Sequence, residues 1–242
     1  MYLSLPDRRK IFFEYHLKDS RFQTILFVNG INQDMQVWVD FKNSLSSYYN
    51  LLFVDLIFQG KSDKEGNPKT FEEHAQDLLL LVNYLGLRQV NLVGISYGGA
   101  VLQRFMVKNQ DYVNKVVLFS SFAHKTPQFN EMNTRWQRTL ELGNFMPAML
   151  FSFGGGNQER LALLKLTHAT THAQDYRPML KNLPIPTLVV HGEKDLLTPA
   201  EVGQEIVKNL PNSQLVVLKN KSHVLNEEAV AESIFLIRDF FG

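Results

Sequence analysis

Apolar and polar residues form alternating blocks along this chain, and the blocks predict a repeated order of strand and helix. Short apolar runs typical of strands buried on both faces occur at 24–28, 51–55, 90–95, 116–119, 186–190 and 214–218, and an earlier run at 11–17 also reads as a strand. Apolar side chains recur at helical spacing in 71–85, 100–108, 199–210 and 226–241. Because helices separate most of these strands, we predict an α/β fold with a mostly parallel sheet and helices on both faces.

Local patterns mark both ends of the helix predicted after residue 70. Thr70 and, three residues later, Glu73 have the form of a capping box, in which each residue satisfies a backbone N–H of the other. Gly86 stands directly after the helical pattern, where a glycine commonly ends a helix. We therefore expect this helix to fill the whole interval between two buried strands.

Residues 124–182 interrupt the alternation of strand and helix. The segment is rich in aromatic and methionine side chains and contains a run of glycines at 154–156. It is too long for an ordinary loop, and the carboxyl ends of parallel strands are where a sheet of this kind binds its ligand. We predict that 1–123 and 183–242 form one core and that 124–182 is a helical cap over it. The alternative is a pair of packing helices with no contact to substrate.

The composition excludes several classes of protein. The chain has 242 residues, and its formal net charge of +1 argues against electrostatic binding of nucleic acid or anionic membranes. It has no cysteine, which excludes disulfides, thiolate catalysis and cysteine-ligated metal centres. Residues 1–10 lack the apolar centre of a signal peptide, and no run approaches the roughly 18 apolar residues of a membrane span. We expect a cytoplasmic protein with no nucleic-acid partner and no membrane insertion.

A G-x-S-x-G sequence, Gly94 to Gly98, stands between the predicted strand 90–95 and the following helix. The glycines occupy the two positions at which a sharp strand-to-helix turn brings backbones too close for a Cβ atom. Such a turn presents the serine hydroxyl above the edge of the sheet. Ser96 is therefore a candidate nucleophile, although a plain glycine-rich turn has the same pattern.

Two further side chains supply what a serine nucleophile needs, a base and an acid that orients the base. Asp195 and His223 each lie just after a predicted strand, so they project at the same sheet edge as Ser96, in the chain order Ser, Asp, His. Taken alone, Asp195 fits a turn or helix-cap aspartate. His223 alone fits a surface histidine near a helix start. The conjunction of all three favours a catalytic triad.

Other histidines are assigned no catalytic or metal-binding role. His191 is interpreted as structural, because Asp195 follows it too closely in sequence to orient it from a separate strand. His168 and His172 have a spacing that can bind a metal, but the glutamate of an H-E-x-x-H pattern is absent. We predict neither a metal site nor a cofactor.

Acyl transfer also needs donors for the oxyanion of the tetrahedral intermediate. The backbone N–H of Tyr97, directly after the nucleophile, is one candidate. The second is the backbone N–H of Ile31, in the loop after strand 24–28, where Gly30 allows the chain to turn. Neither assignment depends on the side chain of the donor residue.

Five segments of the chain, in the right order, resemble the α/β-hydrolase superfamily. They are Val28-Asn29-Gly30 for the oxyanion loop, Asp55 to Asp63 for the loop written D-x-x-G-x-G-x-S, Gly94 to Gly99 for the nucleophile turn, His191 to Asp195 for the acid, and Ser222-His223 for the base. The resemblance covers nearly the whole chain. It implies a triad of Ser96, His223 and Asp195, a cap insertion and no cofactor.

Two positions depart from the family pattern. Asn29 replaces the usual histidine of the oxyanion loop, and Phe58-Gln59 stands where a glycine is common. Both features are similar to the synthases that join two 3-hydroxyacyl chains from acyl carrier protein into the lipid part of rhamnolipids. Ser96 separates the chain from the haloalkane dehalogenases and epoxide hydrolases of this fold, whose nucleophile is aspartate.

These observations predict a serine hydrolase that cleaves a carboxylic ester or thioester with an apolar acyl group through a covalent acyl-enzyme. The alternative is an acyltransferase or ester synthase that uses hydroxyacyl thioesters. A third hypothesis is a non-catalytic member of the fold that binds a ligand without turnover. The expected partner is a small-molecule acyl ester or thioester, free or linked to acyl carrier protein. No feature of the sequence predicts an oligomeric state.

Overall fold

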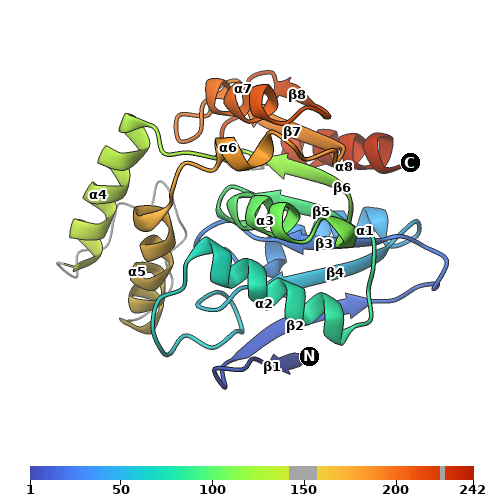
Figure 1. Cartoon of the computed structure of the whole chain (residues 1–242), viewed down its shortest axis with the longest axis horizontal. Coiled ribbons are helices and arrows are strands. Elements are labelled where there is room, and N and C mark those ends of the chain that lie inside the picture. The colour runs from blue at the N-terminus through green and yellow to red at the C-terminus, as the bar shows by residue number, and fades with distance from the viewer. Residues whose placement is uncertain (142–156, 224–226) are drawn as a thin grey trace.

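A computed structural model describes residues 1–141, 157–223 and 227–242. In this part of the chain, an eight-stranded sheet has the order β1-β2-β4-β3-β5-β6-β7-β8 (Figure 1). The strands are β1 (Tyr2–Ser4), β2 (Lys10–His16), β3 (Thr24–Val28), β4 (Asn50–Asp55), β5 (Val90–Ile95), β6 (Val113–Phe119), β7 (Thr187–Gly192) and β8 (Ser213–Leu218). β1 pairs antiparallel with β2, and β2 with β4, whereas the neighbours from β4 to β8 are parallel. The predicted mostly parallel α/β sheet is confirmed.

Helices cover both faces of the sheet. In chain order they are η1 (Met35–Trp38), α1 (Val39–Leu45), α2 (Phe71–Tyr84), α3 (Tyr97–Lys108), η2 (Gln110–Tyr112), α4 (Pro127–Glu141), α5 (Asn157–His172), α6 (Arg177–Leu180), α7 (Ala200–Asn209) and α8 (Glu227–Phe241). Side chains of α2, α3, α6 and α7 form one apolar cluster on the sheet, and side chains of α1 and α8 form another on the opposite face. Figure 1 shows α2 and α3 in front of the sheet, with α1 and α8 behind it.

The period of two along a strand explains why β3 is apolar at every position after its first. Leu26 and Val28 belong to the cluster under α2 and α3, whereas Ile25 and Phe27 belong to the cluster under α1 and α8. Each of these side chains is fully buried. A strand buried on both faces needs a continuous apolar run, which is the pattern seen in the sequence.

The helix and strand ends agree with the predicted patterns in most places. Thr70 and Glu73 form the capping box before α2, and Gly86 has φ +64° after it. α3 begins earlier than predicted, at Tyr97, because the turn at Ser96 leads directly into the helix. β1 has no counterpart among the predicted strands. It has only three residues and none of them is buried, so it does not need the continuous apolar run by which the other strands are predicted.

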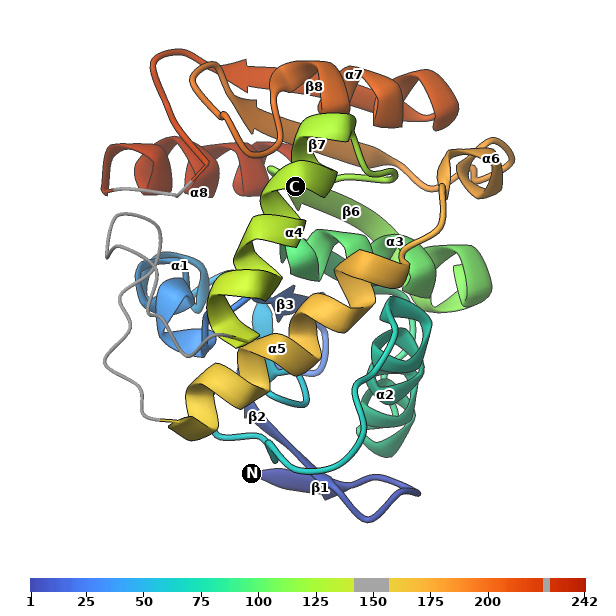
Figure 2. The same ribbon diagram turned by 90° about the vertical axis from the view of Figure 1, so that its left-hand side faces the viewer.

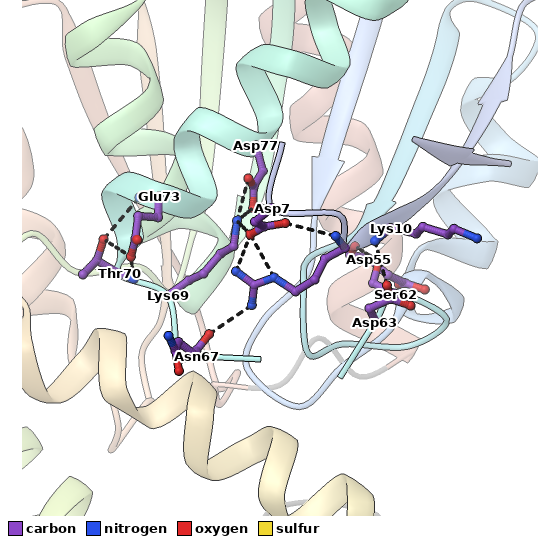
Figure 3. A network of polar contacts seen from close by, with 11 residues as sticks. Asp7, Lys10, Asp55, Ser62, Asp63, Asn67, Lys69, Thr70, Glu73 and Asp77 are labelled. Carbon is purple, nitrogen blue, oxygen red and sulfur yellow. Dashed lines mark hydrogen bonds and ion pairs between the residues drawn. The ribbon is translucent and has the colours of Figure 1, made fainter. Parts of the chain in front are cut away.

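A buried ion pair lies beside the amino-terminal hairpin. Lys69 Nζ lies 2.7 and 2.6 Å from the carboxylate oxygens of Asp77, and both side chains are almost completely buried (Figure 3). Asp7 lies 3.4 Å from the same Nζ and also binds Arg9, which donates to Asn67 O. The cluster joins the turn between β1 and β2 to the segment that leads into α2.

α4 and α5 pack against each other beyond the carboxyl ends of the parallel strands (Figure 2). Tyr176 N donates to Ala123 O at 2.8 Å, so the chain leaves the core and returns to it at one point. α6 packs on α7 and α3. The glycine run at 154–156 lies outside the described residues, and the extent of the cap, 124–182, stays a prediction.

Candidate active site

Ser96 lies at the turn between β5 and α3. Its φ of 51° and ψ of −110° are unusual for a residue with a side chain. Ser96 N donates to Phe119 O at 2.8 Å, which continues the pairing of β5 with β6 to the turn. The strained residue is therefore held by the sheet on one side and by α3 on the other.

Gly98 is required by close contact between this turn and the loop after β3. A Cβ atom at Gly98 would lie 2.3 Å from Val28 O and 2.5 Å from Asn29 O. Real Cβ atoms do not approach a carbonyl oxygen so closely, so no other residue fits here without a backbone shift. The contact brings the amino end of α3 beside the predicted oxyanion loop.

The structure brings Ser96, His223 and Asp195 together. His223 Nε2 lies 3.1 Å from Ser96 Oγ. His223 Nδ1 lies 2.9 Å from Asp195 Oδ2 and 3.1 Å from Asp195 Oδ1. Ser96, Asp195 and His223 follow β5, β7 and β8, respectively, so their approach follows from the parallel sheet.

Asp195 is held by backbone donors of its own loop. The N–H groups of Leu197 and Thr198 donate to Asp195 Oδ1 at 2.9 Å each. Burial acts to raise the pKa of Asp195, but the hydrogen bond and charge of His223 and the Thr198 N–H outweigh it and hold the pKa below its usual value. An ionised, fixed carboxylate is what orients an imidazole and stabilises its charged form.

Thr198 belongs to the site, although its place in the sequence, beside Pro199, indicates only a turn. Its hydroxyl lies 2.9 Å from Asp195 Oδ2, 3.1 Å from His223 Nδ1 and 3.0 Å from Ser120 O. His191 Nδ1 contacts Thr198 O at 2.8 Å. Burial lowers the pKa of His191, which favours its neutral form. The ring of His191 thus supports the loop that carries Asp195, through the backbone carbonyl of Thr198.

Ile31 and Tyr97 both line the cavity that contains Ser96 and His223. Tyr97 is the first residue of α3, where a helix leaves its N–H groups without intrahelical acceptors. Within the described part of the chain, no backbone acceptor contacts the N–H of Ile31 or Tyr97. Ile31 and Tyr97 therefore share the cavity with Ser96, and their role as oxyanion donors stays a prediction.

Asn29, a departure from the family pattern, is a buried junction and does not line the cavity. Its Nδ2 donates to Asp55 Oδ1 at 3.1 Å and to Val54 O at 3.2 Å. Its Oδ1 accepts from Trp38 Nε1 at 2.6 Å. Burial raises the pKa of Asp55, which also accepts from Met35 N at 2.9 Å. Asn29 therefore fixes the start of the oxyanion loop against β4 and η1.

A cavity of about 760 Å³ opens onto Ser96 and His223. This volume lies in the range of about 300–1,000 Å³ that is usual for small-molecule sites. Its apolar side chains include Ile31, Val37, Phe122, Phe129, Trp136 and Leu197. Phe129 and Trp136 come from α4, so a helix of the predicted cap supplies aromatic surface to the site.

The rings of His168 and His172 are tilted by 34° with centroids 4.0 Å apart, and His172 Nδ1 contacts His168 O at 2.9 Å. In residues 1–141, 157–223 and 227–242, no group of three histidine, aspartate or glutamate side chains is placed to hold a metal ion. Among the helices described, none is long and apolar enough to cross a bilayer.

Two family profiles match this sequence. The profile described as alpha/beta hydrolase fold matches residues 23–174, more than half of the chain, and one described as TAP-like protein matches residues 166–235. The chain belongs to the α/β-hydrolase family. Its relatives are named as hydrolases, which supports hydrolase activity in general for this α/β-hydrolase.

One relative is the uncharacterized hydrolase YugF of Bacillus subtilis, 25% identical over 92% of this chain and 90% of its own length. Another is 3-oxoadipate enol-lactonase 2 of Acinetobacter baylyi, 24% identical over 84% of this chain and 83% of its own. The crystal structure of MGS-M2, an alpha/beta hydrolase from a deep-sea metagenome library, has a TM-score of 0.91 at 24% identity. The match covers 100% of this chain and 97% of that one. At this identity, the structural likeness shows the fold of this α/β-hydrolase.

Proposed function

We propose that this α/β-hydrolase is a serine hydrolase that cleaves a carboxylic ester or thioester with an apolar acyl group. The observation that carries the proposal is the unbroken chain of contacts from Ser96 Oγ through His223 to the Asp195 carboxylate. A serine hydroxyl alone is a poor nucleophile, and a histidine in contact with it and with an ionised carboxylate activates it. The relative named an enol-lactonase supports an ester substrate, because a lactone is a cyclic ester.

The distances suggest a step for each group. Because His223 Nδ1 donates to Asp195, Nε2 is free to take the proton of Ser96 Oγ as that oxygen attacks the carbonyl carbon. The oxyanion forms beside the N–H groups of Ile31 and Tyr97. His223 returns the proton to the leaving alcohol or thiol, which departs as the acyl-enzyme forms. Water, deprotonated by His223, then releases the acid and restores Ser96.

The apolar acyl group is inferred from the lining of the cavity. Phe122 and Phe129 lie with ring centroids 4.9 Å apart, on the core and the cap respectively. Removing apolar surface from water at about 25 cal/mol per Å² favours an acyl chain beside these rings. The same surfaces offer little to a strongly charged substrate.

The test compares wild type with Ser96→Ala on p-nitrophenyl acyl esters. Loss of the nucleophile is expected to lower kcat by about 10⁵-fold or more. Ser233→Ala is the matched control, because Ser233 is a buried serine on α8 whose hydroxyl makes no hydrogen bond within the described residues. A fluorophosphonate is expected to label wild type and Ser233→Ala, and to leave Ser96→Ala unlabelled. Retained turnover by Ser96→Ala would overturn the proposal.

A polar pair in the cap favours a second candidate, acyl transfer to a hydroxyl group. Asn133 and Thr170 are buried and line the cavity together with Phe129 and Trp136. Thr170 Oγ1 lies 3.0 Å from Asn133 Oδ1 and 2.8 Å from Thr167 O, so its single proton serves one of two acceptors. Asn133 Nδ2 contacts Thr171 Oγ1 at 3.0 Å, which uses one of its two protons. A hydroxyl on the acyl chain, which both donates and accepts, fits this remaining capacity.

In this second candidate, the hydroxyl of another 3-hydroxyacyl group replaces water and forms an ester with the bound acyl chain. Mass spectrometry of products from a 3-hydroxyacyl thioester separates the two functions. A dimeric ester supports the synthase, and free acid as the sole product supports the hydrolase. In either case, Thr170→Val is expected to lower the preference for hydroxyacyl over unsubstituted acyl substrates by about 10-fold, the loss of one hydrogen bond.

A further inference from the structure

Gln59 lies in the loop between β4 and α2 and is almost completely buried. Its side-chain Nε2 donates to Gly30 O at 2.7 Å. Its Oε1 accepts from Leu56 N at 3.3 Å, which fixes the orientation of the amide. The side chain therefore reaches from one loop to the carbonyl group that directly precedes Ile31.

Gly30 C=O and Ile31 N–H belong to one peptide unit. That unit is planar and trans, so its C=O and N–H point in opposite directions. When Gln59 holds the carbonyl on one side, the N–H must point to the other side, where Ile31 lines the cavity beside Ser96. We propose that Gln59 is a positioning residue, which aims the Ile31 N–H at the oxyanion; this rests on the proposed acyl-transfer function.

The neighbouring peptide is held as well. Gly30 N donates to Gln33 Oε1 at 2.9 Å, so side-chain amides bind both the N–H and the C=O of Gly30. Glycine gives the loop freedom to turn over here, and these two amides oppose it together with a longer backbone bond of 3.3 Å from Gln33 N to Gly30 O. An oxyanion donor contributes most when it already points at the developing charge before the reaction begins.

The backbone that carries Gln59 is itself fixed. Gln59 N donates to Leu56 O at 2.8 Å, and Lys61 N donates to Asp55 Oδ2 at 3.0 Å. Phe58 has the uncommon φ of 78°, and its ring lies 5.4 Å from the Arg9 guanidinium and 5.2 Å from Lys165 Nζ. The sequence departs from the family pattern at Phe58-Gln59. Phe58 anchors this loop, and Gln59 extends from it to the oxyanion loop.

The main variants are Gln59→Met and Gln59→Glu. Met keeps the size of the side chain and removes both hydrogen bonds, whereas an ionised Glu can still accept from Leu56 N but cannot donate to Gly30 O. For both, we expect kcat on p-nitrophenyl esters to fall about 10- to 100-fold with KM changed less than about 2-fold, because the lost interaction acts in the transition state. Inhibition by a trifluoromethyl ketone, which forms an oxyanion with Ser96, is expected to weaken by the same factor.

Asn91→Leu is the matched control. Asn91 is a fully buried amide near the opposite end of β5, where it contacts Gln23 Oε1 at 2.7 Å and Asn114 Nδ2 at 2.9 Å. The control is expected to lower the melting temperature and to leave kcat and the ketone affinity unchanged. If Gln59→Met and Gln59→Glu keep wild-type kcat and ketone affinity, the proposal is wrong.

Gln59→Glu adds a readout that a general loss of packing does not produce. When the carboxyl group of this variant is protonated, it regains an O–H that can donate to Gly30 O. The ratio of kcat for Gln59→Glu to kcat for wild type is therefore expected to rise as pH falls, whereas a constant ratio would count against the proposal. If the Gln59 variants behave like wild type while Ser96→Ala is inactive, only the positioning role of Gln59 is rejected. An active Ser96→Ala would instead remove the proposed function itself.

Discussion

The core and the cap contribute different things to the same cavity. The core provides Ser96, Asp195 and His223 from strand ends, where sheet pairing and backbone hydrogen bonds hold Ser96 and Asp195 in place. The cap contributes Phe129 and Trp136, whose side chains carry no titratable group. We infer that the chemistry of this molecule is encoded in the core, whereas its choice of substrate depends on the core and on α4 together. Variants in each part test this separation.

After Ser96→Ala, the largest effect is expected for Asp195→Asn. Asn can donate a proton to His223 Nδ1, which leaves Nε2 protonated and unable to accept from Ser96, so kcat should fall about 10⁴-fold. KM should change little, because Asp195 lies behind His223 and outside the cavity lining. Steady-state kinetics over the full pH range measure this; a loss smaller than about 10-fold would mean that the contact is structural only.

Lys69→Met is expected to destabilise the core without affecting turnover. The change leaves the Asp77 carboxylate buried without its cation, and burial already raises the pKa of that group. The expected loss is about 3–5 kcal/mol in the free energy of unfolding, measured by urea titration. Lys42→Met is the control, because its partner Glu14 lies 3.6 Å away in a partly exposed pair worth less than about 1 kcal/mol. An equal loss of unfolding free energy in both variants would contradict a special contribution of the buried Lys69–Asp77 pair.

Phe129→Ala tests the cap. Phe129 lines the cavity, and its removal takes apolar surface from the acyl chain, so kcat/KM for long-chain esters should fall about 10- to 100-fold. Acetyl esters, which have almost no acyl chain to bury against Phe129, should be hydrolysed at the wild-type rate. Phe235→Ala is the matched control, because Phe235 is 67% exposed on α8. An equal loss of kcat/KM for short and long esters would mean that Phe129 affects the reaction itself, and the distinction between cap and core would be wrong.

Thr198→Val is expected to have a smaller effect within the core. Valine keeps the shape of threonine and removes the hydroxyl that lies 2.9 Å from Asp195 and 3.1 Å from His223, so kcat should fall about 10-fold, or about 1.4 kcal/mol. Thr187→Val removes a buried hydroxyl at the amino end of β7 and should leave kcat unchanged. Unchanged kcat in both variants would make the Thr198 hydroxyl dispensable.

The smallest effect concerns acid stability. The hydrogen bond from Arg9 lowers the pKa of Asp7 to about 2, so the folded state holds this group as a carboxylate. The resulting stability is complete above the unfolded pKa of about 3.9 and is lost as pH falls toward about 2. Asp7→Asn should therefore flatten the fall in unfolding free energy over this range. The change should stay below about 1 kcal/mol, since the side chain is 40% exposed. A steeper fall of unfolding free energy with decreasing pH in Asp7→Asn would contradict the lowered pKa of Asp7.

The strands are the part of the fold that the sequence predicts best. Runs at 24–28 and 90–95 coincide with β3 and β5, because a strand buried on both faces has to be apolar at nearly every position. The approach of Ser96, Asp195 and His223 is predictable for a related reason, since each follows a parallel strand. Their catalytic roles stay predictions until the variants are measured.

Contacts between side chains and distant backbone groups could not be predicted. Gln59 binds Gly30 O, and the hydroxyl of Thr198 reaches Ser120 O, across segments that are far apart in sequence. A polar residue in a loop has the same local pattern whether it faces water or supports a neighbouring loop. The cap was predictable only as a helical segment, because the placement of its helices depends on the shape of the core beneath them.

The joined ends of the cap have a consequence for how this fold diversifies. Tyr176 N binds Ala123 O, and the buried guanidinium of Arg104 lies 4.0 Å from the Tyr176 ring, so entry and exit are fastened to α3 at one place. A segment whose ends are adjacent can be lengthened, shortened or exchanged without moving the strands on either side of it. We therefore expect that the segment between residues 123 and 176 can be exchanged between related α/β-hydrolases without disturbing the sheet, and that the exchange changes substrate preference.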